Sequence, residues 1–502
     1  MTLVSVRRAT PWRTILATLG LLGVAGCNLA PPYVTPSATG PAAFPQAFKE
    51  TPGWMQAAPD DAGRRGRWWT LFRDPALDGL ETQVQTANPN LQAALAAYDQ
   101  ARAFAAEARS YQVPTVGLND SNTYNRQSDE RPLRGGGQPN DYAANTLGGT
   151  VTYEFDFWGR VRNLVAAGQA QAQASAADLA TAELSLQVQL ADTYLALRGL
   201  DAQNQLLQTT VAAYQRALDL TQARHAGGVS SGLDVDRAQT QLSSAKAQIS
   251  DVLAQRALYE HAIASLVGQP ASGFAIAPAT GQRLVPTFPA GVPSALLQRR
   301  PDIAAAERRA FAANRQIGVT RAAYFPTISL DTLGGWQNTG GNNLLTTPDT
   351  FWTLGPQLAL TLFDGGLRRA QVAATKAAFT AASANYRATV LAAFQQVEDQ
   401  LALASHYADE EIDERTAVTA AQATTDLSLI RYREGATNYL DVVTAQTAEL
   451  QAEQTLLALQ TRRQQAGVDL VRALGGGWDR ADLPSLTRAS SLKKGGSVGV
   501  VN

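Results

Sequence analysis

Residues that could support covalent or metal chemistry are few and scattered. The chain of 502 residues has one cysteine, Cys27, and three histidines, His225, His261 and His406. The histidines do not stand in a metal-ligand spacing such as H-E-x-x-H, and no G-x-S-x-G or Walker sequence is present. A single cysteine permits neither an internal disulfide nor a cysteine-based metal cluster. We therefore expect no enzyme activity, no metal site and no cofactor.

Cys27 is the residue for which the sequence predicts a specific chemical modification. A basic segment over 1–13 precedes an apolar run over 15–25, which is too short to cross a bilayer as a permanent helix, so 1–26 is predicted to be a cleaved export signal. The ending "VAGC" resembles a bacterial lipobox and predicts lipidation of Cys27. Under the sorting rule for such lipoproteins, Asn28 indicates the outer membrane. An ordinary signal peptide with an incidental cysteine is the alternative.

The bulk composition excludes one class of partner. A formal net charge of -1 gives no basic face of the kind that releases counterions from phosphates, so no nucleic acid is expected. With 45% apolar residues the chain can bury large cores. Residues 27–50 are rich in proline and are predicted to be a lipidated tether that spaces the anchor from the body.

The rest of the chain contains an internal repeat, in which two halves share the same order of sequence motifs. Pro89 and Pro114 in the first half match Pro301 and Pro326 in the second, with the same separation between the members of each pair. Turns and helix starts match as well. The predicted division is a first repeat over 51–270, a link over 271–299, a second repeat over 300–476 and a C-terminal segment with a flexible tail over 477–502.

Very long helices dominate each repeat. Proline, the strongest helix breaker, is absent between Pro139 and Pro270 and again between Pro356 and Pro484. Apolar residues at three- and four-residue steps indicate packed coiled-coil hairpins. The predicted helices are 161–226 and 231–268, then 367–433 and 437–475; the longer ones would each run roughly 100 Å.

Strict alternation marks four strands. In "TVTYEFDFWGR" one face carries Val151, Tyr153, Phe155 and Phe157. Strands are predicted at about 114–125, 145–157, 326–337 and 352–363. Their lengths suit tilted transmembrane strands, but four strands cannot close a membrane barrel, so several copies would be required. A small soluble sheet with one face on a helical core is the alternative.

Several motifs in order resemble the TolC-like outer membrane factors of tripartite efflux systems. They are "WWTLFRDPALDGL" at 68–80, "RPDIAAAERRAFAANRQIGVTRAAYFPTISL" at 300–330, "FWGR", "LFDGG" and "YLDVVTAQ" at 439–446. The lipoprotein signal is similar to that of the NodT-like branch. The resemblance implies an α+β membrane protein that forms a homotrimer, in which each chain gives four strands to one 12-stranded β-barrel in the outer membrane of a Gram-negative bacterium. An α-helical coiled-coil barrel would continue it into the periplasm.

The same resemblance implies function and partners. The channel would passively conduct small molecules that arrive from an inner-membrane efflux transporter and a periplasmic adaptor protein. A channel for type I protein secretion is one alternative, and a lipid-anchored periplasmic coiled-coil scaffold is another. The face of Val151, Tyr153, Phe155 and Phe157 would contact outer membrane lipid.

A periplasmic gate at the hairpin turns also follows from the resemblance. By position, Tyr432 takes the place of a tyrosine whose bonds hold the coils shut, Leu440 an apolar constriction place and Asp441 an acidic place. Asp234 takes the corresponding place in the first repeat. Thr437 and Thr444 stand where some members have charged residues, so a salt-bridged lock is not expected; rings of Leu440 and Asp441 would close a cation-favouring pore. Simple helix N-capping is the alternative for both aspartates. The turns that would face the adaptor contain Gly227, Gly228, Val229, Gly435 and Ala436.

Overall fold

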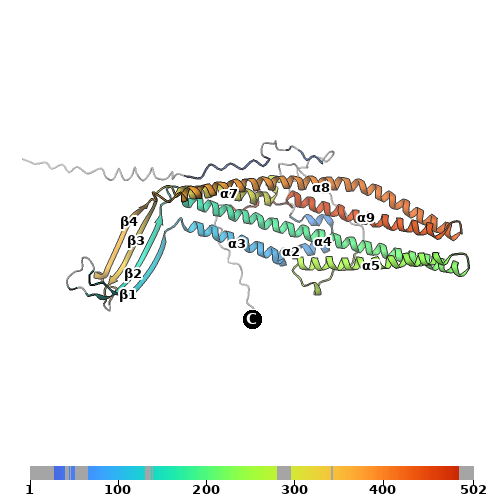
Figure 1. Cartoon of the computed structure of the whole chain (residues 1–502), viewed down its shortest axis with the longest axis horizontal. Coiled ribbons are helices and arrows are strands. Elements are labelled where there is room, and N and C mark those ends of the chain that lie inside the picture. The colour runs from blue at the N-terminus through green and yellow to red at the C-terminus, as the bar shows by residue number, and fades with distance from the viewer. Residues whose placement is uncertain are drawn as a thin grey trace, which may run out of the picture.

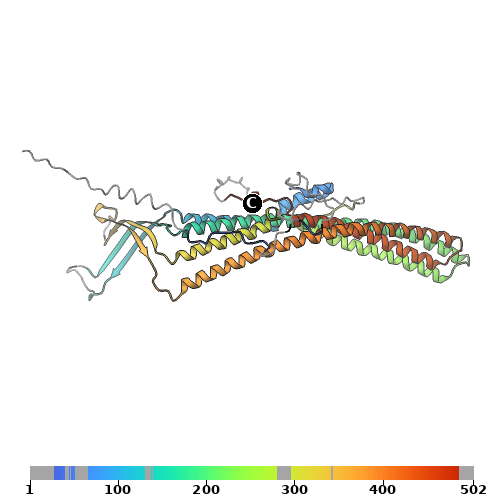
Figure 2. The ribbon, with the colours of Figure 1, turned by 90° about the horizontal axis from the view of Figure 1, so that it is seen from above.

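The computed structural model describes residues 28–39, 45, 47–50, 66–130, 137, 139–279, 296–340 and 343–485. Strands gather at one end of an elongated molecule, and long helices run from them to two turns at the far end (Figure 1). The view from above shows the same separation of sheet and helices (Figure 2). The predicted signal, Cys27 and the chain beyond residue 485 lie outside the described residues.

One antiparallel sheet contains all four strands in chain order. They are β1 (Thr115–Arg126), β2 (Asp141–Glu154), β3 (Thr327–Asn338) and β4 (Thr350–Ala359). The central pair therefore joins a strand from each half of the chain. Among the described residues, β1 and β4 are edge strands, and each has one side without a strand partner.

The register aligns the apolar residues of the four strands on one face. Val116 lies opposite Val151, and Tyr153 lies opposite Leu330, so each pair shares a face. The apolar face carries Val116, Leu118, Leu147, Val151, Tyr153, Ile328, Leu330, Trp336, Trp352, Leu354, Pro356 and Leu358. The other face carries mainly Thr, Ser, Asn and Gln, with Glu154 and Asp331 and with Leu333 and Phe351 as apolar exceptions. Asp120 and Asn122 are polar exceptions on the apolar face.

This apolar face has no cover within the described chain. Val116 is 76% exposed, and Leu118 and Trp352 are each 79% exposed. No α-helix of the described chain makes an extensive contact with any strand. The alternative of a sheet that packs one face on a helical core is therefore wrong.

Two strands end earlier than predicted. The strand expected at 145–157 ends at Glu154 because the carboxylate of Asp156 accepts the backbone N–H groups of Val161 and Arg162, at 3.0 and 2.9 Å, and so begins a helix. Phe155 and Phe157 therefore lie beyond the strand. The strand expected at 352–363 ends at Ala359, whose partner Thr327 follows a proline that has no N–H to extend the ladder.

Two helical hairpins account for most of the length of the molecule. Hairpin 1 is α4 (Arg160–Ala226) with α5 (Gly232–Leu266), and hairpin 2 is α8 (Leu367–Arg433) with α9 (Tyr439–Leu474). The first helix of each has 67 residues, which corresponds to roughly 100 Å. The second helices are slightly shorter than the predicted 231–268 and 437–475. Ser231 and Asn438 cap their starts, and Gly268 and Gly475, at φ of 73° and 93°, follow their ends.

Shorter elements pack along these hairpins. They are α2 (Pro75–Ala87), α3 (Pro89–Ser110), α6 (Leu296–Arg299), α7 (Pro301–Ala322) and the 3-10 turns η2 (Trp68–Phe72), η3 (Ala271–Gly273), η5 (Thr347–Asp349) and η6 (Arg480–Asp482). The largest core lies where η2 and α2 meet the middle of α4. Trp68, Trp69 and Leu77 pack there with Leu190 and Tyr194. No helix among the described residues is both long and apolar enough to cross a membrane.

A buried ion network fixes the start of the link between the repeats. The Asp201 carboxylate accepts from Arg198 at 2.9 Å and from Arg256 at 2.7 Å, and the Asp201 side chain is 1% exposed. The same guanidinium groups donate to the carbonyl oxygens of Ala277 and Ile276, at 2.8 and 2.6 Å. Both arginines thus hold the link against hairpin 1. Residues 280–295 of the link lie outside the described chain.

Residues 28–39 bind the body of the molecule rather than leading away from it. The Asn28 side chain accepts from Asn163 at 2.9 Å, and the Tyr33 hydroxyl donates to Glu307 at 2.8 Å. The Tyr33 ring also packs edge-on against Phe311 of α7, with ring centres 5.0 Å apart. Residues 28–39 of the predicted tether thus pack on the body; we call them the N-terminal strap.

Candidate gate at the hairpin tips

The turns of the two hairpins have the same geometry. Gly228 and Gly435 each follow the first helix with φ of 71° and 78°. In hairpin 1 the Val229 N–H donates to the Arg224 carbonyl at 2.9 Å, and in hairpin 2 the Ala436 N–H donates to the Arg431 carbonyl at 2.8 Å. This is the Schellman arrangement, which needs a left-handed residue and so favours glycine. Gly227 lies between helix and turn, and Val229 is 67% exposed at the tip.

The N-capping interpretation of the two tip aspartates is wrong. Ser231 caps α5 by accepting the Leu233 N–H at 3.1 Å, and Asn438 caps α9 by accepting the Asp441 N–H at 3.2 Å. Asp234 instead accepts from the Ser230 hydroxyl at 3.2 Å and lies 3.6 Å from Arg237. Asp441 accepts from the Thr437 hydroxyl. Both carboxylates still lie in a first helical turn, where the helix dipole favours negative charge.

Tyr432 is buried between the two hairpins. It is 3% exposed and packs edge-on against Tyr439, with ring centres 5.2 Å apart, in a cluster that includes Tyr214, Leu242 and Val442. Its hydroxyl lies 3.4 Å from that of Ser230. Tyr432 of hairpin 2 thus lies beside Ser230 of hairpin 1.

Arg224 is a residue of this site that the sequence analysis missed. Its Nη1 donates to the Arg433 carbonyl at 3.0 Å, and its guanidinium carbon lies 4.9 Å from the centre of the Tyr432 ring. A basic residue in the last turn of a helix is a signal that it can bind helix-terminal carbonyls. That the accepting carbonyl belongs to the other hairpin becomes visible only in the tertiary structure.

Leu440 and Asp441 point away from this cluster. Leu440 is 46% exposed and Asp441 is also exposed, whereas their neighbours Tyr439 and Val442 are buried. Both side chains are therefore exposed on the single chain.

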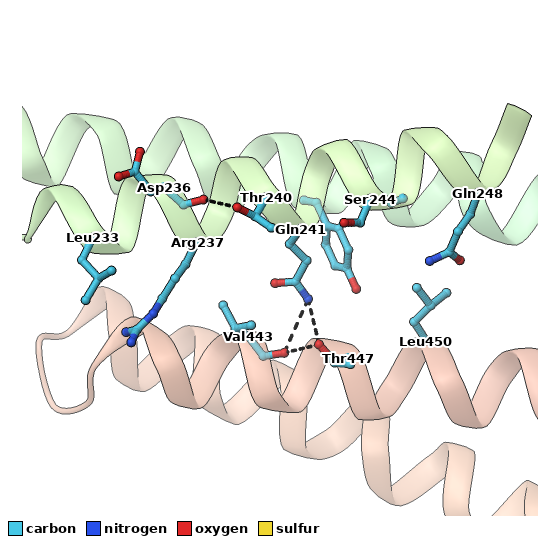
Figure 3. A pocket seen from close by; sticks show the side chains of 12 residues that line it. Leu233, Asp236, Arg237, Thr240, Gln241, Ser244, Gln248, Val443, Thr447 and Leu450 are labelled. Carbon is cyan, nitrogen blue, oxygen red and sulfur yellow. Dashed lines mark hydrogen bonds between the residues drawn. The ribbon is translucent and has the colours of Figure 1, made fainter.

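Hydrogen bonds continue from the tips along the groove between α5 and α9 (Figure 3). The Gln241 amide reaches across the groove and donates to the Thr447 hydroxyl at 3.1 Å. The Tyr214 hydroxyl donates to the Gln446 carbonyl at 3.1 Å. Burial raises the pKa of Tyr214 and Tyr439 to about 12, so both hydroxyls remain protonated near neutral pH. The groove has a volume of about 510 Å³.

The predicted lipid-facing residues are only partly in the sheet. Val151 and Tyr153 lie on its apolar face. Phe155 follows the strand but still donates its N–H to the Ile328 carbonyl at 2.8 Å, and Phe157 lies further on and is 42% exposed. Nearby, Trp158 donates its indole N–H to the Pro326 carbonyl at 2.7 Å. Among the described residues, no group of three or more His, Cys, Asp or Glu side chains could hold a metal ion.

Known proteins resemble the chain along almost its whole length. OprJ, an outer membrane protein of Pseudomonas aeruginosa, is 32% identical over 468 residues, which is 93% of this chain and 96% of OprJ. The toluene efflux pump outer membrane protein TtgF of Pseudomonas putida is 30% identical over 471 residues, which is 93% of this chain and 97% of TtgF.

Solved structures give the same result. The outer-membrane channel OprN matches with a TM-score of 0.82 and 28% identity, over 90% of this chain and all of the other. The open state of the MtrE channel of Neisseria gonorrhoeae matches with a TM-score of 0.79 and 26% identity, over 90% of this chain and 99% of the other. The family described as "Outer membrane efflux protein" matches residues 80–269 and 292–476. The chain belongs to the outer membrane efflux protein family.

Proposed function

We propose that this protein is the outer membrane channel of a tripartite efflux system and passively conducts small molecules out of the cell. The observation that carries the proposal is the register of the sheet, which gives the four strands one mainly apolar, exposed face and one mainly polar face. A wall of this kind meets lipid on one side and water on the other. Small-molecule cargo is favoured because relatives are named for toluene, solvent and antibiotic efflux.

The edges of the sheet support a trimer. Within the chain, β1 and β4 each have one unpaired side, and a sheet of four strands is too narrow to close by itself. Three copies pair β1 of one chain with β4 of the next and close a 12-stranded barrel. The apolar face runs from Ile328 to Trp336, about 26 Å of strand, which is comparable with the ~25 Å apolar band of outer membrane barrels.

The helices give the channel its length. In the trimer, three copies of the two hairpins form a tunnel that continues from the barrel into the periplasm. Its tip meets a periplasmic adaptor at the turns of Gly227, Gly228, Val229, Gly435 and Ala436. Leu440 and Asp441 line the pore there, which fits their exposure on a single chain.

The strap supports the predicted lipid anchor. Asn28 is bound to Asn163 in the first turn of α4, a few residues beyond the end of β2 at Glu154. An acyl chain on Cys27 would enter the inner leaflet beside the barrel. Mass spectrometry of the membrane-extracted protein tests this point: an acylated Cys27 at the N-terminus is expected, and an unmodified Cys27 contradicts it.

Reconstitution into planar lipid bilayers tests the channel itself. We expect the purified protein to run as a trimer in detergent and to give discrete conductance steps. A folded trimer that gives no conductance would support the scaffold alternative instead.

A further inference from the structure

The first strands of the two repeats, β1 and β3, match residue by residue. Each has 12 residues, and each follows a proline, Pro114 and Pro326. Thr115 at the start of β1 therefore corresponds to Thr327 at the start of β3. The two strands can be aligned over their whole length without a gap.

The second strands, β2 and β4, are aligned by the helices that follow them. These helices, α4 and α8, each have 67 residues, and each begins after a glycine in the left-handed region, Gly159 and Gly366, at φ of 73° and 93°. Counting back from the two glycines without a gap makes Thr152 of β2 correspond to Ala359 of β4. This alignment does not depend on the pairing of the strands.

The observed register of the sheet agrees with both alignments. Thr115 of β1 lies opposite Thr152 of β2. By the two alignments this pair corresponds to Thr327 of β3 opposite Ala359 of β4, and the sheet contains that pair. Every other pair of β3 and β4 follows from the pairs of β1 and β2 in the same way. The internal repeat therefore preserves strand register.

The remaining pair, β2 with β3, joins the two repeats, and its counterpart is β4 with β1. In β2 and β3, Thr152 lies opposite Asp331. Their counterparts are Ala359 of β4 and Asn119 of β1, which lie on the two edges of the sheet. A sheet of four strands is too narrow to close on itself, so these two residues meet only between two chains.

We propose that β4 of each chain pairs with β1 of the partner subunit in one register, with Ala359 opposite Asn119 of the partner subunit. We call this pair of strands the seam. It rests on the proposed channel function, in which several copies close one barrel, and it adds the residues that meet where the copies join.

The seam continues past the end of β4 in the single chain. Phe155 lies beyond β2, yet its N–H donates to the Ile328 carbonyl of β3 at 2.8 Å. The counterpart of Phe155 is Leu362, and the counterpart of Ile328 is Val116. Leu362 and Val116 are 87% and 76% exposed on the single chain. In the seam, Leu362 lies opposite the partner's Val116, so each covers the other.

The seam also joins like faces of the two sheets. On the apolar face, Trp352 lies opposite the partner's Arg126, and both side chains are exposed on the single chain. An arginine beside an indole ring is a favourable contact. On the polar face, Gln357 lies opposite the partner's Ser121. A slip of one residue would join the apolar face of one chain to the polar face of the next. A slip of two keeps the faces, so only the repeat excludes it.

Disulfide cross-linking measures the register directly. Residues directly opposite in an antiparallel pair have Cα atoms about 4.5–5.5 Å apart, which a disulfide can bridge. The variant with Ala359→Cys and Asn119→Cys is expected to link neighbouring chains on mild oxidation. A denaturing gel without reductant then shows covalent trimers. A disulfide within one chain is excluded because β1 and β4 are three strand spacings apart, roughly 14 Å.

Four positions on the polar face give a balanced set of controls. The matched pairs are Ala359→Cys with Asn119→Cys, and Gln357→Cys with Ser121→Cys. Exchanging the partners places each thiol two residues out of register, with Cα atoms roughly 7–8 Å apart. Both matched pairs are expected to cross-link at least about ten-fold faster than both exchanged pairs. Each single variant is the control for Cys27.

The outcomes separate the seam from the channel. Faster linking of an exchanged pair, or no linking of any pair in a protein that is a trimer and conducts, overturns the seam and keeps the channel. Linked trimers of the matched pairs that give no conductance in planar bilayers keep the seam and reject the channel. A folded protein that remains a monomer in detergent overturns both.

Discussion

Tyr153 and Leu330 lie directly opposite each other on β2 and β3, although they come from different halves of the chain. Both belong to the apolar face, which continues to Val116 on one edge strand and Leu354 on the other. The pairing shows how the two halves combine: each contributes a strand pair, and one register serves both. A slip of one residue would move the apolar side chains of that face to the polar face.

Neighbouring residues of β1 test which face meets lipid. Leu118 is on the apolar face and Asn119 on the polar face, and both are exposed. Leu118→Lys is expected to destabilise the membrane-inserted trimer by about 2–4 kcal/mol if it lies near mid-bilayer, and Asn119→Lys by less than about 1 kcal/mol. Urea unfolding in lipid vesicles measures both. Similar losses for the two variants would contradict the assignment of the faces.

The contact of the strap with α7 predicts an unusual response to alanine. A Cβ at Gly318 would lie 2.8 Å from the Ala30 Cβ and 2.6 Å from the Asn163 amide nitrogen, whereas a Cβ at Gly79 meets nothing within 4 Å. Both glycines are inside helices, where alanine is favoured by about 0.5–1 kcal/mol. Gly79→Ala is therefore expected to stabilise the protein, and Gly318→Ala to lower the melting temperature and expose the strap to protease. Stabilisation by both would show that the strap does not bind tightly.

A structural feature could be predicted from the sequence when the residues that cause it lie close together in the chain. The absence of proline within a segment and the presence of glycine at its turns are local signals, and they predicted the long helices. The strand ends depend on Asp156, whose side chain caps the start of α4, and on Pro326, which immediately precedes the neighbouring strand β3. The alternation of residues within each strand shows neither of these contacts. At the caps, aspartate, serine and asparagine are all suitable residues, and the backbone geometry selected Ser231 and Asn438.

The gate shows the same limit more strongly. Tyr432 could be placed from its motif, but its contacts could not. Arg224 was missed because its acceptor lies 209 residues away on the other hairpin. No pattern within either turn shows that the two helix ends meet.

Glu81 predicts a dependence of stability on pH. It is fully buried in α2, and neither carboxylate oxygen has a hydrogen-bond partner among the described residues. Burial, with a smaller effect of Asp78, raises the pKa of Glu81 to about 9. The folded state therefore holds a proton that the unfolded state loses above about pH 4, and stability falls as the pH rises through that window toward 9.

Glu81→Gln removes this titration while keeping the shape. Relative to the variant, the unmodified protein is expected to lose about 1–3 kcal/mol between pH 5 and pH 9. Melting temperatures across that range measure the difference, and Glu107→Gln on the exposed side of α3 is the control. If the curves of the unmodified protein and the Glu81→Gln variant remain parallel, the carboxylate is not buried in neutral form.

The central claim is that the sheet is the wall of a water-filled pore with lipid on its outer side. Val151 and Thr152 are adjacent in β2 and lie on opposite faces. The direct measurement is single-channel conductance of Val151→Cys and Thr152→Cys proteins before and after a charged, membrane-impermeant thiol reagent, with the unmodified protein as the control for Cys27. The account predicts that the reagent changes the conductance of the Thr152→Cys channel and leaves that of Val151→Cys unchanged. A response at Val151→Cys with none at Thr152→Cys would contradict it.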